Sequence, residues 1–217
     1  PLIASRILKA KEKGAKLIVI DPRRTQIARY ADIFVRQRLG TDVAWINGLM
    51  HIILKEGWEN KEFIENRTEG FEDLKKELEH YPPEKVEEIT GISRTDLRAI
   101  AESYAKAKKG SIVYCMGITQ HTTGTENVLS LANLAMLTGQ IGRLNTGVNP
   151  LRGQNNVQGA CDMGGLPNVY TGYQPVADET VAKKFEEAWK APLSRKPGLT
   201  IMEMFQAIDE GKVKALY

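Results

Sequence analysis

Short apolar runs alternate with stretches of helical periodicity along this chain. At the start, Ile3, Ile7 and Leu8 recur at the spacing of one helix face, and Gly14 ends the pattern. An all-apolar run over residues 17–20 follows at once. Such a run is typical of a strand that is buried on both faces of a parallel sheet. A helix that leads directly into a buried strand predicts an α/β fold.

Further elements are marked by the same periodicity and by signals at their ends. Asp42 can cap a helix whose apolar face extends to residue 54, and Ser93 with Asp96 approximates a capping box before another helix. A second apolar run at residues 111–116 predicts a strand, which we expect beside the first. Three more helices are predicted over residues 122–136, 179–189 and 201–208, and a last strand over residues 212–217.

Residues 139–172 interrupt this regularity. The stretch is rich in glycine and asparagine, has little periodicity and carries few charges. A long irregular segment is usually either disordered or functional, and the low charge argues against disorder. We therefore expect a functional loop, with one α/β domain over residues 1–154 and part of a second α/β domain over residues 155–217. The abrupt ends indicate a fragment of a longer protein.

Composition excludes several classes of protein. The 217 residues carry a formal net charge of only +3, and lysine and glutamate are interleaved, which is typical of a solvated surface rather than a nucleic-acid-binding face. No apolar run approaches the roughly 20 residues that cross a bilayer, and no signal-peptide pattern is present. We expect a cytoplasmic protein that neither binds nucleic acid nor inserts into a membrane.

The two cysteines, Cys115 and Cys161, cannot supply a four-thiolate iron–sulfur or zinc site. A disulfide between them is conceivable, but lone cysteines are more often small buried apolar residues. His51, His80 and His121 do not form a spaced ligand set either. The sequence therefore predicts no metal ligand in this chain.

Three polar segments stand where ligands bind in α/β proteins, after predicted strands or before helices. In the first segment, the aspartate carboxylate could accept hydrogen bonds from a base or a ribose, and the two arginines could bind phosphates. The alternative is a helix cap with exposed arginines. In the second, an ordinary cap is an equally good explanation. In the third, a glycine could admit a flat cofactor, whereas His121 is more often structural. The segments are Asp21, Pro22, Arg23, Arg24 and Thr25; Gly40, Thr41 and Asp42; and Met116 to His121, which includes Gln120.

The richest polar stretch covers residues 149–165 and holds one arginine, five side-chain amides and four glycines. Side-chain amides both donate and accept hydrogen bonds, so these residues could bind the polar groups of a heterocycle. Its arginine, Arg152, could hold a small carboxylate. A polar loop with a purely structural role at a domain junction is the alternative.

Long sequence patterns add a family resemblance. Residues 116–174 read MGITQHTTGTENVLSLANLAMLTGQIGRLNTGVNPLRGQNNVQGACDMGGLPNVYTGYQ, and upstream stretches read IVIDPRRTQIARYAD and RTEGFEDLKK. All three resemble the alpha (large) subunit of molybdopterin-dependent formate dehydrogenases. The pattern NPLRGQNNVQGACDMG is the most specific, and the likeness covers nearly the whole chain.

The resemblance implies a Rossmann-like, parallel-sheet domain that binds molybdenum or tungsten through two molybdopterin guanine dinucleotides (bis-MGD). It implies oxidation of formate to CO2, with two electrons leaving to an iron–sulfur or flavin subunit. Arg152 matches the arginine beside the metal that orients formate. The implied cofactor contacts are Asp21, Pro22, Arg23, Arg24, Thr25, Gly40, Thr41, Asp42, Met116, Gln120, Gly153 and Gln154.

The same resemblance places other parts of the enzyme outside this segment. The [4Fe-4S] cluster belongs to a more N-terminal part. The cysteine or selenocysteine that ligates the metal also lies outside this segment, as does a C-terminal domain that closes over the cofactor. We therefore expect the fragment alone to be inactive. A nitrate or other oxyanion reductase, or a nucleotide-binding module without redox chemistry, are the alternatives. An arginine in the NPLRGQNN context favours formate.

Overall fold

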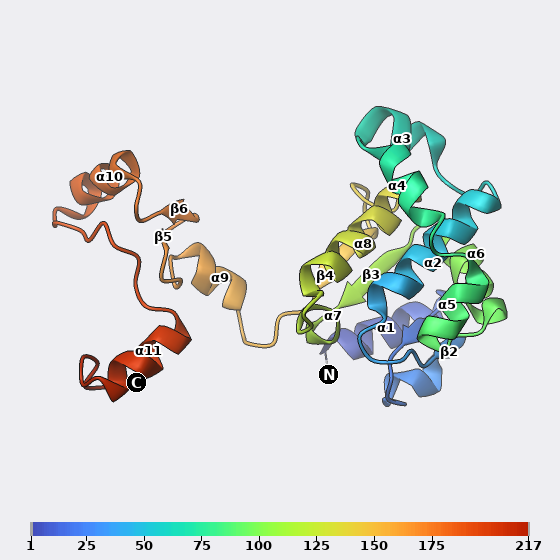
Figure 1. Cartoon of the computed structure of the whole chain (residues 1–217), viewed down its shortest axis with the longest axis horizontal. Coiled ribbons are helices and arrows are strands. Elements are labelled where there is room, and N and C mark those ends of the chain that lie inside the picture. The colour runs from blue at the N-terminus through green and yellow to red at the C-terminus, as the bar shows by residue number, and fades with distance from the viewer. Residues whose placement is uncertain (1, 217) are drawn as a thin grey trace. The chain divides into compact units, whose positions relative to one another are not determined.

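The computed structural model describes residues 2–216. The chain divides into two compact units between Leu151 and Arg152. Figure 1 labels the elements of each unit. In the first unit they are α1 (Leu2–Glu12), β1 (Ile18–Ile20), the 3-10 helix η1 (Ile27–Tyr30), β2 (Ile33–Val35), α2 (Asp42–Lys55), α3 (Lys61–Arg67), α4 (Phe71–Leu78), α5 (Pro83–Thr90), α6 (Arg94–Ala105), β3 (Ser111–Tyr114), α7 (Met116–Thr119), α8 (Gly124–Leu137) and β4 (Gly147–Pro150).

Helix α2 is the centre of the first unit. Ile46, Met50 and Ile53 are fully buried on it. The helix packs against α4, α5, α6 and α8, and Figure 1 shows it between α8 and the pair formed by α5 and α6. Burial of each such side chain stabilises the fold by about 1.5–3 kcal/mol. The loop that leads into α2 is therefore attached to the most firmly packed helix of the unit.

The strands of the first unit form two small parallel sheets. β1 pairs with β2, and β3 pairs with β4. The prediction that the strands at residues 17–20 and 111–116 are neighbours is wrong, because they lie in separate sheets. Each of them pairs instead with a strand that the hydrophobic pattern did not reveal: β2 has three residues and β4 lies in the glycine-rich stretch. The fold is mixed α/β, and no sheet among residues 2–216 has more than two strands.

Most predicted helices are confirmed, but the start of α2 differs from the prediction. The N-cap of α2 is Thr41, and Asp42 is the first helical residue. The carboxylate of Asp42 accepts a hydrogen bond from the indole nitrogen of Trp45 at 3.1 Å instead of capping the backbone. In α6 the prediction holds, because the Ser93 hydroxyl accepts from the backbone N–H of Asp96 at 3.1 Å.

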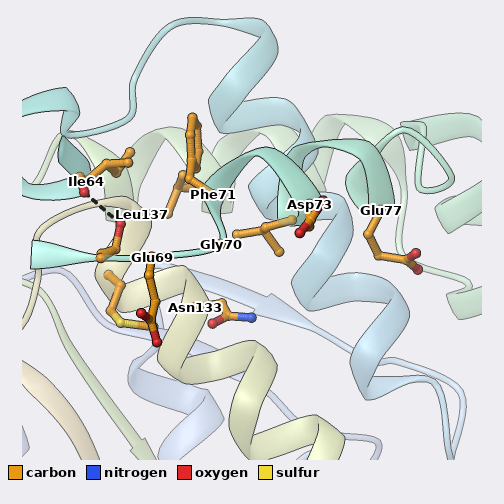
Figure 2. A pocket seen from close by; sticks show the side chains of 11 residues that line it. Ile64, Glu69, Gly70, Phe71, Asp73, Glu77, Asn133 and Leu137 are labelled. Atoms are coloured by element: carbon orange, nitrogen blue, oxygen red, sulfur yellow. Dashed lines mark hydrogen bonds between the residues drawn. The ribbon is translucent and has the colours of Figure 1, made fainter.

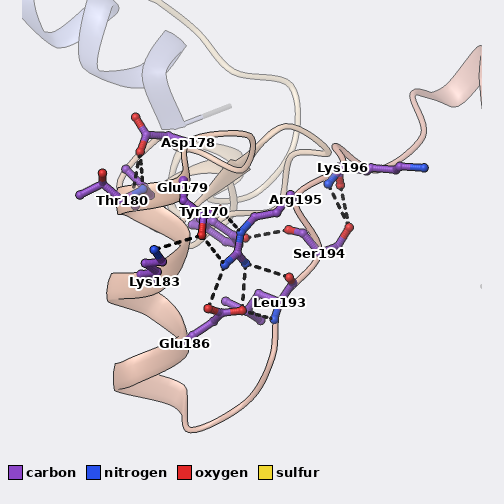
Figure 3. A network of polar contacts seen from close by, with 11 residues as sticks. Tyr170, Asp178, Glu179, Thr180, Lys183, Glu186, Leu193, Ser194, Arg195 and Lys196 are labelled. Carbon is purple, nitrogen blue, oxygen red and sulfur yellow. Dashed lines mark hydrogen bonds and ion pairs between the residues drawn. The ribbon is translucent and has the colours of Figure 1, made fainter.

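The second unit is built around one helix and an aromatic cluster. Its elements are α9 (Val157–Asp162), β5 (Val169–Tyr170), β6 (Gln174–Pro175), α10 (Glu179–Trp189) and α11 (Ile201–Asp209). The rings of Tyr170, Phe185 and Trp189 pack together, with centroids 4.8 Å to 6.0 Å apart. Figure 3 shows Arg195 bound to Glu179 and Glu186 of α10, which ties the following segment back to the helix.

Two predictions for the C-terminal third need correction. The stretch over residues 139–172 is less irregular than expected, because it contains β4, α9 and β5. The strand predicted at the C-terminus is wrong for residues 212–216. The backbone N–H groups of Lys212 and Val213 both donate to the carbonyl of Ala207, which closes the end of α11 as a turn. Tyr217 lies outside the described residues.

Candidate cofactor-binding site

The loop that follows β1 is folded back on itself by Asp21. Its carboxylate accepts from the backbone N–H of Arg23 at 2.7 Å, and the N–H of Thr25 donates to the carbonyl of Arg23 at 2.9 Å. Aspartate forms turns of this kind because its short side chain reaches the backbone two residues on. Pro22 is half-buried, whereas Arg23 and Arg24 are exposed. The loop thus presents two free guanidinium groups at the carboxyl end of a parallel strand.

The loop that follows β2 is joined to the first loop. The Nε of Arg36 donates to the carbonyl of Pro22 at 2.8 Å. Arg38 reaches in another direction, and its guanidinium donates to the carbonyls of Glu88 and Ile89 at the end of α5. The hydroxyl of Thr41 donates to the carbonyl of Arg38 at 2.7 Å, just before α2 begins.

Both loops line one open groove in the first unit. Arg23, Arg36 and Arg38 all contribute to it, and no acidic residue is among the described residues that line it. Guanidinium groups bind phosphate through paired hydrogen bonds, so this groove suits the phosphates of a dinucleotide. The full lining is Pro22, Arg23, Arg36, Gln37, Arg38, Leu39, Thr90 and Gly91.

Two buried polar atoms of these loops have no hydrogen-bond partner in the described structure. They are the hydroxyl oxygen of Thr25 and the side-chain oxygen of Gln37. An unpaired buried acceptor costs about 1–3 kcal/mol, and such groups are rare unless a ligand or water completes them. A guanine base carries N–H donors, and ribose and phosphate carry oxygens. The residues present therefore fit a guanine dinucleotide.

The third predicted segment begins where β3 ends. Its short helix α7 is held by Asn127 of α8, a fully buried residue whose side-chain amide donates to the carbonyl of Ile118 at 2.9 Å. Gly124 allows the close approach, because a Cβ there would lie 2.1 Å from the carbonyl oxygen of Thr119. Met116 and Gln120 remain exposed on this rigid turn. Sequence reasoning missed Asn127, since a buried amide has no local signature.

His121 links the second and third segments. Its Nε2 lies 2.9 Å from the carbonyl oxygen of Gly117 and 3.9 Å from a carboxylate oxygen of Asp42. Asp42 is itself 2% exposed. The structural interpretation of His121 is supported by the contact with a backbone carbonyl. The structure thus brings the second and third segments together within the first unit.

Arg152, Gly153 and Gln154 belong to the second unit and are exposed. An Nη of Arg152 donates to the side-chain oxygen of Gln158 at 3.0 Å. An arginine held by a neutral amide keeps its positive charge available for an anion.

A second hollow, of about 390 Å³, lies among α3, α4 and α8 and contains none of the predicted site residues. Figure 2 shows Glu69, Asp73 and Glu77 along α4 and the segment that leads into it. Three carboxylates would repel phosphates, so this hollow does not suit the cofactor. Its other lining residues are Ile64, Thr68, Gly70, Phe71, Leu74, Asn133, Met136 and Leu137.

The part of the chain that the structure describes contains no group of three or more histidine, cysteine, aspartate or glutamate side chains arranged to hold a metal. Cys115 and Cys161 are both free thiols, and Cys115 donates to the carbonyl of Leu151 at 2.7 Å. None of the helices within residues 2–216 is both long and apolar enough to span a membrane.

Comparisons with known proteins agree with the resemblance seen in the sequence. The chain is 56% identical over 219 residues to the F420-dependent formate dehydrogenase subunit alpha of Methanocaldococcus jannaschii, which covers 100% of this chain and 32% of that protein. It is 46% identical over 218 residues to formate dehydrogenase H of Escherichia coli, covering 100% of this chain and 30% of the relative. The chain thus spans about a third of the length of these relatives.

A solved structure is also similar. The acetylene hydratase from Pelobacter acetylenicus matches with a TM-score of 0.61 and 35% sequence identity, over 63% of this chain and 19% of that one. Its name denotes a hydratase, so likeness of structure does not by itself identify the reaction. The molybdopterin oxidoreductase family matches residues 1–217, the whole chain. From its sequence patterns and its full-length match, this chain is a member of the molybdopterin oxidoreductase family, and it resembles the alpha subunits of formate dehydrogenases.

Proposed function

We propose that this chain is the segment of a formate dehydrogenase that binds a molybdenum or tungsten bis-MGD cofactor and supplies the arginine that orients formate. The observation that carries the cofactor part is the arginine-lined groove, with two unpaired buried oxygens in its loops. The substrate is proposed from the relatives that are named formate dehydrogenases.

The first unit would hold the guanine dinucleotides. Arg23 and Arg36 carry exposed guanidinium groups that can donate to phosphate oxygens. The carboxylate of Asp21 or the side-chain oxygen of Gln37 can accept from N–H groups of the base or from a ribose hydroxyl. The predicted contacts Pro22, Arg24, Thr25, Gly40 and Thr41 lie in the same two loops, and Asp42 is the first residue of the helix that follows them. Together they would fix the nucleotide end of the cofactor and leave its metal end free for chemistry.

Met116 and Gln120 would contact a pterin. They stand on a turn that Asn127 and Gly124 hold in place, so the exposed thioether and amide have defined positions. Gly153 and Gln154 are proposed to line the cofactor in the second unit. When bound, the metal and its pterins supply the two-electron redox chemistry, and the protein contributes binding, orientation and electrostatics.

Arg152 would act on formate. A planar guanidinium can donate two parallel hydrogen bonds to a carboxylate, and its charge stabilises negative charge on the carboxylate oxygens. With the carboxylate held by both oxygens, the C–H bond has one orientation. Electrons would leave through a [4Fe-4S] centre in another part of the whole protein to an iron–sulfur or flavin subunit. Two of the relatives are named F420-dependent, so F420 is proposed as the final electron acceptor.

The whole gene product tests this proposal. Purified without air, it should contain molybdenum or tungsten with two pterin guanine dinucleotides for each metal, and it should reduce a dye with formate. Nitrate added to the dithionite-reduced protein should not reoxidise it at a comparable rate. Fast turnover with nitrate and none with formate would identify an oxyanion reductase instead. A well-folded whole protein without metal or pterin would identify a nucleotide-binding module without redox chemistry.

A further inference from the structure

The side chain of Gln158 connects Arg152 to two further polar groups of the second unit. Its oxygen accepts from an Nη of Arg152 at 3.0 Å. Its amide nitrogen donates to a carboxylate oxygen of Asp162 at 3.0 Å and lies 3.1 Å from the hydroxyl of Tyr173. Every one of these contacts lies within residues 152–173, a segment that contains α9.

The chemistry of the two ends determines which way the amide of Gln158 faces. A guanidinium only donates hydrogen bonds, and an ionised carboxylate only accepts them. With Arg152 on one side and Asp162 on the other, the amide oxygen must face the arginine and the amide nitrogen must face the aspartate. The reverse orientation would put N–H against N–H and oxygen against oxygen. The amide therefore has one stable orientation, with its dipole aligned between a positive and a negative group.

The groups that hold Gln158 are themselves held by the backbone. Gln158 and Asp162 lie one turn apart on α9, so the helix sets their separation. The carbonyl of Asp162 accepts from the backbone N–H of Gly172 at 2.7 Å, which attaches the next loop to the end of the helix. Tyr173 then adopts φ of 59°, a left-handed conformation that is uncommon for a bulky residue. Backbone strain of this kind persists where the surroundings impose it, and it is found preferentially at functional sites.

We propose that Gln158 is a positioning residue that fixes the guanidinium of Arg152 for formate, with Asp162 and Tyr173 setting its orientation. This inference rests on the proposed function of Arg152. One Nη of the arginine is directed toward Gln158, which leaves the other edge of the planar group for the substrate carboxylate. Gln158 itself touches neither substrate nor cofactor in this role. Loss of Gln158 should therefore weaken binding of small carboxylate-like anions without removing the cofactor.

The test uses the whole holoenzyme and two readouts. The first is the KM and kcat for formate. The second is the equilibrium binding of nitrite to the oxidised enzyme, measured by calorimetry, because nitrite is a bent triatomic anion of the same charge as formate. Gln158→Met keeps the length of the side chain and removes its hydrogen bonds. It should raise the nitrite Kd and the formate KM roughly tenfold, with metal and pterin content unchanged.

A rescue distinguishes positioning from general loss of structure. Gln158→Glu alone places a carboxylate next to the carboxylate of Asp162. When Gln158→Glu is combined with Asp162→Asn, the new carboxylate accepts from Arg152 and the new amide donates to that carboxylate. The double variant should recover most of the nitrite affinity. Gln206→Met is the matched control, because Gln206 also donates to an acidic residue four positions on, Glu210 at 3.1 Å. It should leave both readouts unchanged.

The outcomes separate this inference from the proposed function. If Arg152→Lys weakens nitrite binding while Gln158→Met and Gln158→Glu do not, the positioning role is overturned and the role of Arg152 stands. If Arg152→Lys also leaves nitrite binding and formate kinetics unchanged, both are overturned. If Gln158→Met does not fold, the comparison of Gln158→Glu with its Asp162→Asn rescue decides, and equal nitrite affinities in the two would refute the inference.

Discussion

The Nε of Arg36 and the carbonyl oxygen of Pro22 lie 2.8 Å apart, and this hydrogen bond joins the loops that follow β1 and β2. It positions a guanidinium next to Arg23 in the groove that we assign to the cofactor. Arginines close together repel one another, so an arrangement of this kind is favoured when an anion binds between them. An anion bound in the groove would explain why three arginines gather there, although the positive and negative charges of the whole chain nearly balance.

Arg36→Ala should reduce the pterin and metal content of the whole enzyme. The substitution removes both the loop-joining hydrogen bond and a charge that, in our proposal, would face the phosphates. A hydrogen bond to a charged group contributes about 1.5–3 kcal/mol, so nucleotide affinity should fall roughly 10- to 100-fold. Metal and pterin are measured per mole of purified protein. Arg29→Ala removes an exposed arginine outside the groove and should leave the content unchanged; equal losses in both variants would contradict the assignment.

Arg152→Lys should depress formate oxidation much more than it depresses cofactor content. Lysine keeps the charge but loses the two parallel donors. An electrostatic donor of this kind is worth about 2.7–4 kcal/mol, or roughly 10²–10³ in rate. Metal, pterin and turnover are measured on one preparation. Parallel losses of all three would mean that Arg152 only braces its loop.

Gly48→Ala should destabilise the first unit. A Cβ at this position of α2 would lie 2.8 Å from a methyl group of Val86 on α5, and Val86 is fully buried. Overpacking lowers the free energy of unfolding by about 1–3 kcal/mol. The better helix propensity of alanine relative to glycine raises it by at most about 1 kcal/mol. The midpoint of urea unfolding should therefore fall.

The second variant for this site is Val86→Ala, alone and combined with Gly48→Ala. Since the clash is with the methyl groups of Val86, the double variant should lose less stability than the sum of the single losses. Strict additivity would mean that the two side chains do not meet, and that α2 and α5 are farther apart than the structure places them.

The ion pair between Arg195 and Glu186 predicts a loss of local stability in acid. The Arg195 guanidinium, 2.9 Å away, and the backbone N–H of Leu193 lower the pKa of Glu186 from 4.5 to about 2 (Figure 3). Because the folded pKa is the lower one, this pair stabilises the fold fully above about pH 4.5, and the contribution is lost as the pH falls toward about 2. Glu179 shares Arg195, and its pKa is lowered by the same guanidinium.

Cleavage by an acid protease in the segment after α10 measures this effect. At about pH 4, Glu186→Gln should be cut faster than the unchanged protein, and near pH 2 the two rates should converge. Glu187→Gln, one position further on and exposed, is the control and should follow the unchanged protein throughout. A constant ratio of rates across the whole range would refute the role of the ion pair.

The helices were the most predictable part of this fold. Apolar spacing and end signals such as Ser93 with Asp96 are local, so they predicted α1, α2, α6, α8, α10 and α11. The predicted cap at Asp42 was wrong because Trp45, one turn on, offers the carboxylate a better partner than the backbone. Local preference is readily overridden when a side chain of the same turn can donate to a buried charge.

The amino-acid sequence by itself determined the helices and the family, because periodicity, capping residues and a long specific motif are written in consecutive positions. Only the tertiary structure decided which strands pair, since strand pairing depends on contacts between separate segments of the chain. In this structure β1 pairs with β2, and β3 pairs with β4. It also brought Arg36, Gln37 and Arg38 to the groove, buried Asn127 beneath α7 and set Gln158 against Arg152. These roles arise from contacts between loops and helices, and hydrophobic periodicity does not predict which loop a polar side chain will contact.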